Sequence, residues 1–328
     1  MTEESFNWLL KEVEPHIQKA DTIMRMALPA ALKLEIVLHL FATGTSLRAL
    51  ELLFYVSKTS ICLMIHKVCD AICLALKDYI QIPSHEEWKA TETGFKDTWN
   101  FPKCCGVIDG KHVVMKSQND AGNRHQNIAF FAVCDDDYCF KYIDVWSKKK
   151  ITDVFGDSNL IRALEDDLLP PDHVIVGNEN FPLKKYLMKQ YQGDNLSEKQ
   201  KVFNHRLSRA RSTIDNAFGL LVSRFRIFEK PLPFTADKIE KIVKTCCALH
   251  NWLRIIKSPI QVTTLDEEDS DTGFIMLGSW RELLVEGLAE FPKHMKDCST
   301  EEACKIRDDY ADYFMGEEAV SRQLQRIS

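Results

Sequence analysis

The sequence predicts an α/β protein in which a helical N-terminal region precedes a mixed sheet flanked by helices. Apolar residues recur at helical spacing up to residue 98, the pattern changes to alternation from Trp99, and two long amphipathic helices follow after residue 200. With 328 residues and 45% hydrophobic content, the chain can bury a sizeable core. We expect three parts: residues 1–98, 99–257 and 258–328.

Charge is unevenly distributed along the chain. The formal net charge is −6, but residues 258–328 contain sixteen Asp and Glu against seven Lys and Arg, a net −9, which leaves +3 on residues 1–257 (−6 minus −9). The acidity therefore belongs to the C-terminal part and does not exclude nucleic-acid binding by the rest. The eleven cysteines show no paired CxxC pattern, so we expect reduced thiols and no structural zinc.

The apolar stretches predict no membrane association. The N-terminal "MTEESFNWLLKEVEP" interleaves charges with apolar residues, unlike a signal peptide, and "LEIVLHLFA" is too short to span a bilayer. From the sequence we therefore expect an intracellular protein that does not enter the membrane.

Residues 1–98 have the pattern of several helices with short joints. After "LKLEIVLHLFATG" and "TSLRALELLF" comes "VSKTSICLMIHKVCDAICLALKDYI", for which Ser57 is the candidate N-cap. The apolar face of this third helix holds Ile61, Ile65, Val68, Ile72 and Leu76. The outline is helix-turn-helix-like, and Lys58, Thr59 and Ser60 would then face nucleic acid. A helical bundle that packs against the next domain explains the same pattern.

From Trp99 the alternation predicts strands. "CCGVID" and "HVVMK" are expected as two extended segments, "NIAFFAVCD" and "YCFKYIDVW" as a hairpin that turns at "DDD", and "TDVFGDSNLIRALEDD" as a helix. The short strand "HVIVG" comes next. Two long helices follow, "NHRLSRARSTIDNAFGLLVSRFRIF" and "TADKIEKIVKTCCALHNWLRII", the latter with Thr235 as candidate N-cap. Beyond Pro259, "TTLDEEDSDTG" predicts an acidic linker before a tail with one or two short helices.

Three polar residues stand at informative places in this order of elements. Asp109 ends the first expected strand, Asn178 comes just after "HVIVG", and Asp215 lies on a late helix. This is the layout of a ribonuclease-H-like metal nuclease. Taken alone, Asp109 before Gly110 is also a common turn pair, so a turn residue and a metal ligand are competing interpretations.

Four motifs in the same order carry a resemblance to a known family. The segments "GVIDGKHVVMK", "VIVGNENFPLKKYLMKQY", "FNHRLSRARSTIDNAFGLLVSRFRIF" and "CCALHNWL" resemble the DDE endonuclease domain of Harbinger-type transposases and of the host nuclease-like proteins derived from them. The N-terminal "LKLEIVLHLFATGTSLRALELLF" is similar to the same family's helical region. The resemblance covers residues 1–257. It implies DNA cleavage or strand transfer by two Mg²⁺ or Mn²⁺ ions, roughly 3.5–4 Å apart, held by three acidic ligands.

The resemblance places these ligands at Asp109, Asn178 and Asp215, with Asp109 and Asp215 as the catalytic pair. Asn178 stands where the family usually has Asp, so a carbonyl oxygen remains but a negative charge is lost. Asp215 stands where the family usually has Glu, and its carboxylate is withdrawn by about 1.5 Å, whereas metal geometry tolerates only about ±0.2 Å. Glu179 is adjacent to Asn178 but points to the other face of an extended segment. We therefore expect weakly bound metal and weakened cleavage.

A basic stretch lies around the third ligand position. Residues 201–230 contain seven Lys and Arg against two acidic residues. Arg206, Arg209 and Arg211 are candidate DNA-binding residues, although Arg211 could instead pair with Asp215 at i, i+4. A further candidate cluster is Lys148, Lys149 and Lys150, for which a solvated loop is the alternative. His112 and His205 are more typical of structural histidines than of ligands.

The preferred interpretation is a domesticated Harbinger transposase-derived protein that associates with DNA or chromatin and whose cleavage is weakened or lost. The resemblance implies a nuclear location, with the cytoplasm as the alternative, and a separate Myb-like DNA-binding partner protein. Two other interpretations stay open. One is an active divalent-metal-dependent DNA endonuclease or transposase, and the other is a protein-interaction scaffold that does not bind nucleic acid.

Overall fold

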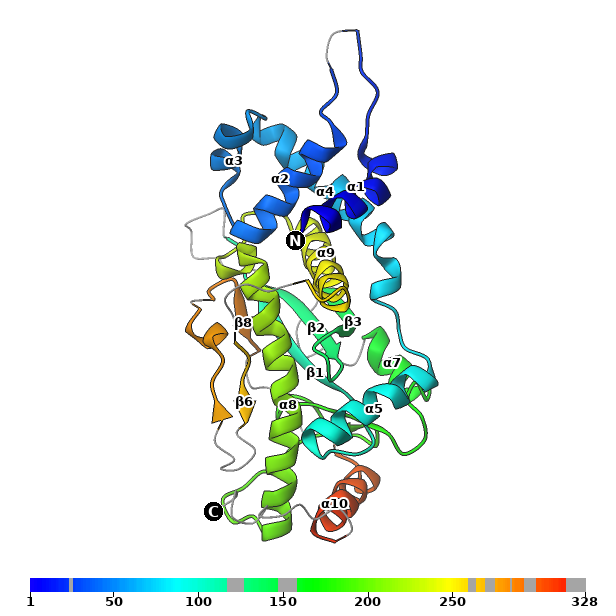
Figure 1. The fold of residues 1–328 in the computed structure, drawn as a ribbon. Helices are drawn as coiled ribbons and strands as arrows, with labels where there is room; N and C mark the ends of the chain where they lie inside the picture. The colour runs from blue at the N-terminus through cyan, green and yellow to red at the C-terminus, as the bar shows by residue number, and fades with distance from the viewer. Residues whose placement is uncertain are drawn as a thin grey trace.

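The computed structural model describes residues 1–23, 26–116, 127–146, 158–258, 264–268, 275–283, 285–291 and 299–316. A helical N-terminal region lies at one end of the molecule and a mixed sheet lies at its centre (Figure 1). The long helix α8 runs along the sheet, and the C-terminal helix α10 packs at its far end. The predicted α/β class, a mixed sheet with flanking helices, is confirmed.

The N-terminal helices form as their patterns predict. They are α1 (Glu3–Ile17), α2 (Ala30–Thr43), α3 (Leu47–Phe54) and α4 (Lys58–Ala75). Ser57 is the N-cap of α4, and its hydroxyl accepts a hydrogen bond from the Ser60 N–H at 3.3 Å. The predicted apolar face of α4 is buried, and α4 packs against α1 and against α9 of the core.

Helices α3 and α4 meet at a sharp angle. They are bent by 101° across the joint at residues 55–57, where Tyr55 adopts a left-handed backbone conformation. Together the two helices have the length and apolar composition of a broken membrane span. No single helix in the described ranges is long and apolar enough to cross a membrane.

The central sheet has strand order β3-β2-β1-β4-β5, with β8 added beside β1. Its strands are β1 (Cys104–Val113), β2 (Ile128–Cys134), β3 (Phe140–Trp146), β4 (Val174–Val176), β5 (Leu187–Met188) and β8 (Leu288–Glu290). Strands β1, β2 and β3 pair antiparallel, whereas β4 pairs parallel with β1 and with β5. The predicted hairpin of β2 and β3 is confirmed.

Helices cover both faces of the sheet. Helices α8 (Glu198–Arg224) and α9 (Ala236–Ile255) contact one face, and α5 (His85–Trp99) and α7 (Asn159–Glu165) contact strands on the other side of the core. Alternate residues of β2 enter two different clusters: Phe130 packs with Phe218 of α8, and Phe131 packs in the cluster of Trp88 from α5. Because both faces are covered, β2 is buried throughout and reads as a continuous apolar run.

The expected break of the first strand at Asp109 is wrong. β1 is one ten-residue strand, and Asp109 and Gly110 pair within it with Ala132 and Phe131 of β2. A side chain at Gly110 would collide with Phe291, since its Cβ would lie 1.9 Å from that ring. The Asp-Gly pair therefore marks close packing inside a strand rather than a turn.

Helix α8 starts earlier than its apolar pattern indicates. It begins at Glu198 because Ser197 and Gln200 form a capping box, in which the Ser197 N–H donates to Gln200 Oε1 at 2.9 Å. The expected helix of residues 152–167 is described only from its N-cap Ser158 onward. Its earlier residues lie outside the described ranges.

The C-terminal part is more integrated with the core than an acidic linker would be. Strands β6 (Glu267–Glu268) and β7 (Ile275–Met276) pair with each other, the short helix η3 (Ser279–Glu282) follows, and β8 extends the central sheet. Helix α10 (Glu301–Met315) packs on α8, with Phe314 against Phe101 and Phe203. It is longer than the short helices expected there.

The motif "ALHNWL" holds α9 against the hairpin. Asn251 Oδ1 accepts from the Phe140 N–H at 2.8 Å, and Asn251 Nδ2 donates to the carbonyl oxygens of Phe140 and Tyr79 at 2.7 and 2.8 Å. His250 Nε2 donates to the Tyr138 carbonyl at 2.9 Å. Both side chains are buried, so they satisfy backbone groups that would otherwise lose their hydrogen bonds on burial.

His250 should make the fold acid-sensitive. Burial lowers the pKa of His250 to about 3, partly opposed by the hydrogen bond to Tyr138, while the unfolded chain has the usual His pKa of about 6.5. The unfolded state binds the extra proton between these values, so the free energy of unfolding should fall by about 3 kcal/mol as the pH is lowered from 7 to 4.

Urea denaturation at pH 7 and pH 4 measures this contribution. His250→Gln should be less stable than the natural protein at pH 7 but should lose clearly less stability at pH 4. The control is His16→Gln, because His16 is exposed. An equal loss of stability in the natural protein and His250→Gln would contradict the assignment.

Candidate functional site

Strand pairing brings two of the predicted ligands together. Val107 of β1 pairs parallel with Val176, the last residue of β4, so Asp109 and Asn178, each two residues further along the chain, become neighbours. The Asn178 Nδ2 donates a hydrogen bond to Asp109 Oδ1 at 2.6 Å. The contact follows from the parallel register and needs no loop rearrangement.

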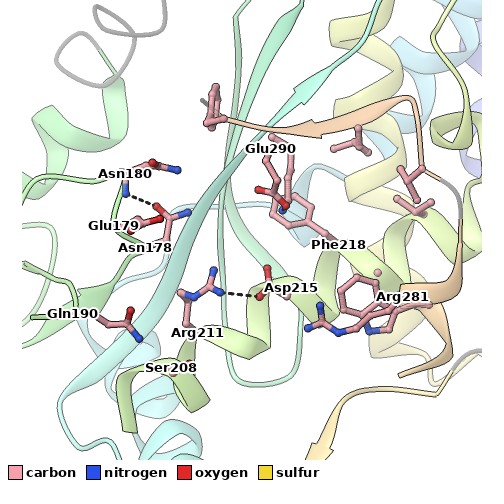
Figure 2. Close-up of a pocket in the computed structure, with 17 residues that line it drawn as sticks. Asn178, Glu179, Asn180, Gln190, Ser208, Arg211, Asp215, Phe218, Arg281 and Glu290 are labelled. Carbon is pink, nitrogen blue, oxygen red and sulfur yellow. Dashed lines mark hydrogen bonds and ion pairs between the residues drawn. The ribbon is translucent and has the colours of Figure 1, made fainter. Parts of the chain in front are cut away.

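The orientation of the Asn178 amide is set by a second hydrogen bond. Its Oδ1 accepts from the backbone N–H of Asn180 at 2.9 Å (Figure 2). The amide nitrogen must therefore face Asp109. Rotating the amide would place its NH₂ against the Asn180 N–H and its oxygen against the Asp109 carboxylate. Asn178 therefore presents a donor, rather than an oxygen ligand, to Asp109.

Asp109 is buried and is held by groups of the chain itself. It is 1% exposed, and its Oδ1 also accepts from the Gly110 N–H at 2.8 Å. Its Oδ2 has no hydrogen-bond partner in the described part of the chain, and Lys111 Nζ lies 3.6 Å away. Burial raises the pKa of Asp109 to about 6; Lys111 opposes this shift and the charge of Asp215 adds to it.

Lys111 lies on the same face of β1 as Asp109, because residues two apart on a strand share a face. Its ammonium donates to Glu290 Oε1 and lies 5.3 Å from the centre of the Phe218 ring. Glu290 reaches it because β8 pairs antiparallel with β1, with Glu290 opposite Lys111. Sequence analysis missed both residues: the i, i+2 spacing from Asp109 could have indicated Lys111, but no pattern indicates the pairing of a three-residue strand.

Asp215 faces the same region from α8. Arg211, one turn earlier on the helix, places its Nη2 3.4 Å from Asp215 Oδ2, and Figure 2 shows this pair. The alternative considered for Arg211, an i, i+4 ion pair, is therefore what the structure contains. The carboxylate of Asp215 has a cation partner from its own helix.

These residues line one cleft of about 570 Å³. Its walls include Lys111, Asn178, Asp215, Phe218, Arg281 and Glu290 (Figure 2). Asp109 lies buried behind Lys111 and Asn178, the side chains that it contacts. Residues that the chain separates widely thus gather at a single concave place, which is where a binding or reaction site is expected.

The side chains around this cleft fit ion pairs and hydrogen bonds better than a pair of divalent cations. Of the three predicted ligands, Asn178 directs an N–H group at Asp109, and Asp215 is paired with Arg211. Among the described residues, no group of three His, Cys, Asp or Glu side chains is disposed to hold a metal ion. Hard divalent cations need several oxygen ligands that converge on one point. The arrangement therefore offers a polar, charge-compensated cleft.

The basic candidates take different places. Arg206 is buried at 3% exposure; its Nη1 donates to the Asn100 carbonyl at 3.1 Å and its guanidinium stacks on Phe314 at 4.4 Å. Arg206 therefore helps to pack α10 against α8, and its burial argues against the predicted contact with DNA. Arg209 and Arg211 line a second hollow of about 190 Å³ beside the cleft. Lys148, Lys149 and Lys150 lie outside the described residues.

The two candidate histidines and Glu179 lie at three different places. His112 packs edge-on against Phe291, at 4.4 Å between ring centres, on the sheet face opposite Asp109. It is structural. His205 lines the second hollow. Glu179 is exposed on the wall of the main cleft, which Asn178 also lines. The expected opposite directions of the two side chains are not found, because both residues lie beyond the end of β4, where strand alternation no longer applies.

Comparisons with known proteins agree with the family resemblance of the motifs. A family model described as "DDE superfamily endonuclease" matches residues 110–251, a range that contains Asn178 and Asp215 and starts one residue after Asp109. The chain is 22% identical over 239 residues to the protein named antagonist of like heterochromatin protein 1 from Arabidopsis thaliana, which covers 66% of this chain and 60% of that protein. It is 29% identical over 199 residues to the Arabidopsis thaliana protein ALP1-like, covering 53% and 48%.

The match is partial in length. The chain spans between about half and three-fifths of the length of these relatives. No solved structure matches it. The matched range nevertheless contains the end of β1, strands β2 to β5, α8 and most of α9, and the resemblance inferred from the motifs is confirmed. Residues 110–251 of the chain are therefore similar to the endonuclease domain of the DDE superfamily, in agreement with the motifs.

Proposed function

We propose that the chain is a domesticated Harbinger transposase-derived protein that associates with DNA or chromatin and whose cleavage is weakened or lost. The observation that carries the proposal is the Asn178 amide, whose nitrogen donates to Asp109 where the family places a second acidic ligand. In this arrangement the Asp109 carboxylate receives hydrogen bonds from the chain, while Asp215 is paired with Arg211. A cation entering the cleft would have to displace these partners.

The proposal includes a ribonuclease-H-like core and a helix-turn-helix-like N-terminal region. The strand order β3-β2-β1-β4-β5, with an acidic residue on the central strand β1, supports the first. The 101° bend between α3 and α4 across a three-residue joint is the geometry of a helix-turn-helix. Lys58 and Thr59 at the start of α4 are exposed, and its opposite face is buried on the bundle.

Location and partners follow from the relatives. One relative's name describes an antagonist of like heterochromatin protein 1, which places that protein in chromatin biology. We therefore propose a nuclear location and a chromatin-associated role for this chain. The Myb-like DNA-binding partner protein is proposed from the family resemblance alone. DNA would meet the chain near the second hollow, where Arg209, Arg211 and His205 gather. Divalent metal would bind only weakly, because Asn178 directs its amide nitrogen at Asp109 and Asp215 is paired with Arg211.

Restoring the acidic ligands tests the loss of cleavage. The natural protein should not cleave labelled DNA with Mg²⁺ or Mn²⁺, whereas the Asn178→Asp, Asp215→Glu double variant should gain metal-dependent cleavage. In the double variant two carboxylates would flank Asp109 and could bridge cations. Binding of Mn²⁺, followed by titration calorimetry, gives a second readout and should be much tighter in the double variant.

The matched control is the double variant with Asp109→Ala added, which should lose both gains. Cleavage by the natural protein that disappears in Asp109→Ala would instead support the active endonuclease. A restored variant that folds but neither binds Mn²⁺ nor cleaves DNA would count against the descent of this cleft from a metal site.

The arginines that line the second hollow provide a test of DNA association. The natural protein should bind a short DNA duplex with an affinity that falls as salt rises, because each phosphate contact releases counterions. Arg209→Gln and Arg211→Gln should each weaken binding and reduce the salt slope by roughly 1 for a single phosphate contact. Fluorescence anisotropy over a series of salt concentrations measures both.

The control is Arg226→Gln, because Arg226 is exposed and paired with Glu229 at the end of α8, away from the hollow. If neither Arg209→Gln nor Arg211→Gln changes DNA binding, DNA must bind to another surface of the protein. Absence of salt-sensitive binding by the natural protein would favour the protein-interaction scaffold.

A further inference from the structure

Residues 264–268, 275–283 and 285–291, here called the C-terminal segment, lie beyond the range matched to the family and supply one wall of the cleft. Trp280 and Arg281 of η3 and Leu288 and Glu290 of β8 all line it. Glu290 is therefore a cleft residue that neither the motifs nor the family match includes.

The segment is fastened to α8 by side chains of the "DNAFG" motif. Asn216 Oδ1 accepts from Trp280 Nε1 at 2.9 Å and from the Asp266 N–H at 3.0 Å. Gly219 leaves room for the Trp280 ring, since a Cβ there would lie 2.3 Å from it. Arg281 Nε pairs with Asp266 Oδ1 at 2.9 Å. The contacts with Asn216 and Gly219 hold the segment beside the cleft, although its composition is acidic.

Strand β8 carries the segment to the base of the cleft. Its residues 288–290 pair with residues 111–113 of β1, and the following Phe291 stacks on Phe131 with ring centres 4.9 Å apart. The backbone of β8 is thereby fixed on both sides of Glu290. The Glu290 side chain is nevertheless 73% exposed, whereas its partner Lys111 is only 10% exposed. The carboxylate can consequently rotate away into solvent while the strand stays in place.

We propose that Lys111 is a phosphate-binding residue of the cleft and that Glu290 occupies its ammonium group in cis, so that the C-terminal segment competes with nucleic acid for this position. The proposal rests on the DNA association proposed above and adds its regulation. A carboxylate and a phosphodiester oxygen are both anionic acceptors for the same ammonium donor.

The charges in the cleft indicate that the departure of Glu290 favours phosphate binding. The cations that line it are Lys111, Arg211 and Arg281, and each has an acidic partner in the structure. Asp215 and Asp266 hold the two arginines from sites that are 16% and 4% exposed, so these pairs are part of the wall. Glu290 is by contrast mostly in solvent. Its departure removes one negative charge from the cleft and frees a donor of Lys111, both of which favour a bound phosphate.

The interaction of Lys111 with Asp109 supports this assignment. Asp109 Oδ2 lies 3.6 Å from Lys111 Nζ, a distance at which the charges attract without a close hydrogen bond. Together with the Phe218 ring beneath it, Asp109 keeps the ammonium directed into the cleft when Glu290 leaves. Lys111 is then a cation positioned by buried groups, with its donors available to a ligand.

A double-mutant cycle on Glu290 and Lys111 tests the proposal. The probe is a short fluorescein-labelled DNA duplex of mixed sequence in EDTA, and binding is followed by fluorescence anisotropy. Glu290→Gln should bind about two- to fivefold more tightly than the natural protein, the range expected when one part-exposed ion pair is removed. Lys111→Met should bind more weakly. Glu290→Gln should give no gain when Lys111→Met is already present, because the two residues act on each other.

The matched control is Glu286→Gln, which removes the same charge from the same segment at an exposed position. A general effect of net charge would strengthen binding equally in Glu286→Gln and Glu290→Gln, and this outcome would overturn the proposal while leaving DNA association intact. A gain from Glu290→Gln that persists in the Lys111→Met background would also overturn it. No binding by any of the proteins, Glu290→Gln included, would overturn the proposed DNA association and this inference with it.

Thermal unfolding separates these effects from misfolding. Glu290→Gln and Glu286→Gln change exposed side chains and should unfold at the temperature of the natural protein. Should Lys111→Met be unstable, Lys111→Gln takes its place in the cycle, with the same expectation that the gain from Glu290→Gln is lost.

Discussion

The pairing of β1 with its neighbours is the constraint on which the rest of the structure depends. This ten-residue strand is buried along its whole length and pairs with β2 on one edge and with β4 and then β8 on the other. Its period of two directs Asp109 and Lys111 to the face covered by α8. The parallel register with β4 brings Asn178 to Asp109, and the antiparallel register with β8 brings Glu290 to Lys111. One strand thus determines which side chains share the cleft.

Within that frame, charge is balanced by the chain itself. Asp109 receives hydrogen bonds from Gly110 and Asn178 and faces Lys111, and Asp215 faces Arg211. A buried carboxylate without such partners would be costly, so these donors explain how the acidic residues of the cleft can stay inside the fold. The cleft brings together the three positions proposed as metal ligands, while its polar groups are directed at one another.

The C-terminal segment changes the character of this site. Motif residues that belong to the family match, Asn216 and Gly219, hold Trp280 and Asp266 of the segment against α8. An acidic segment that would repel DNA as a free tail is placed beside the basic side chains of α8 and Lys111. Residues outside the matched range thereby pair with Lys111 and line the cleft.

The sequence by itself determined the elements with strong periodicity: α4 with its Ser57 cap, the β2–β3 hairpin and the apolar faces of α8 and α9. It also determined the family resemblance, through four ordered motifs. It also determined which residues are changed, because Asn178 and Asp215 can be read from the motifs alone. Tertiary structure decided the direction of the Asn178 amide, the burial of Arg206 under α10, the continuity of β1 through Gly110 and the meeting of Lys111 with Glu290. The nearby Asn180 N–H orients the Asn178 amide, but only the fold places Asp109 opposite its nitrogen. The other three features depend on contacts between segments far apart in the chain, and local patterns carry little information about such contacts, least of all when the pairing strand is only three residues long.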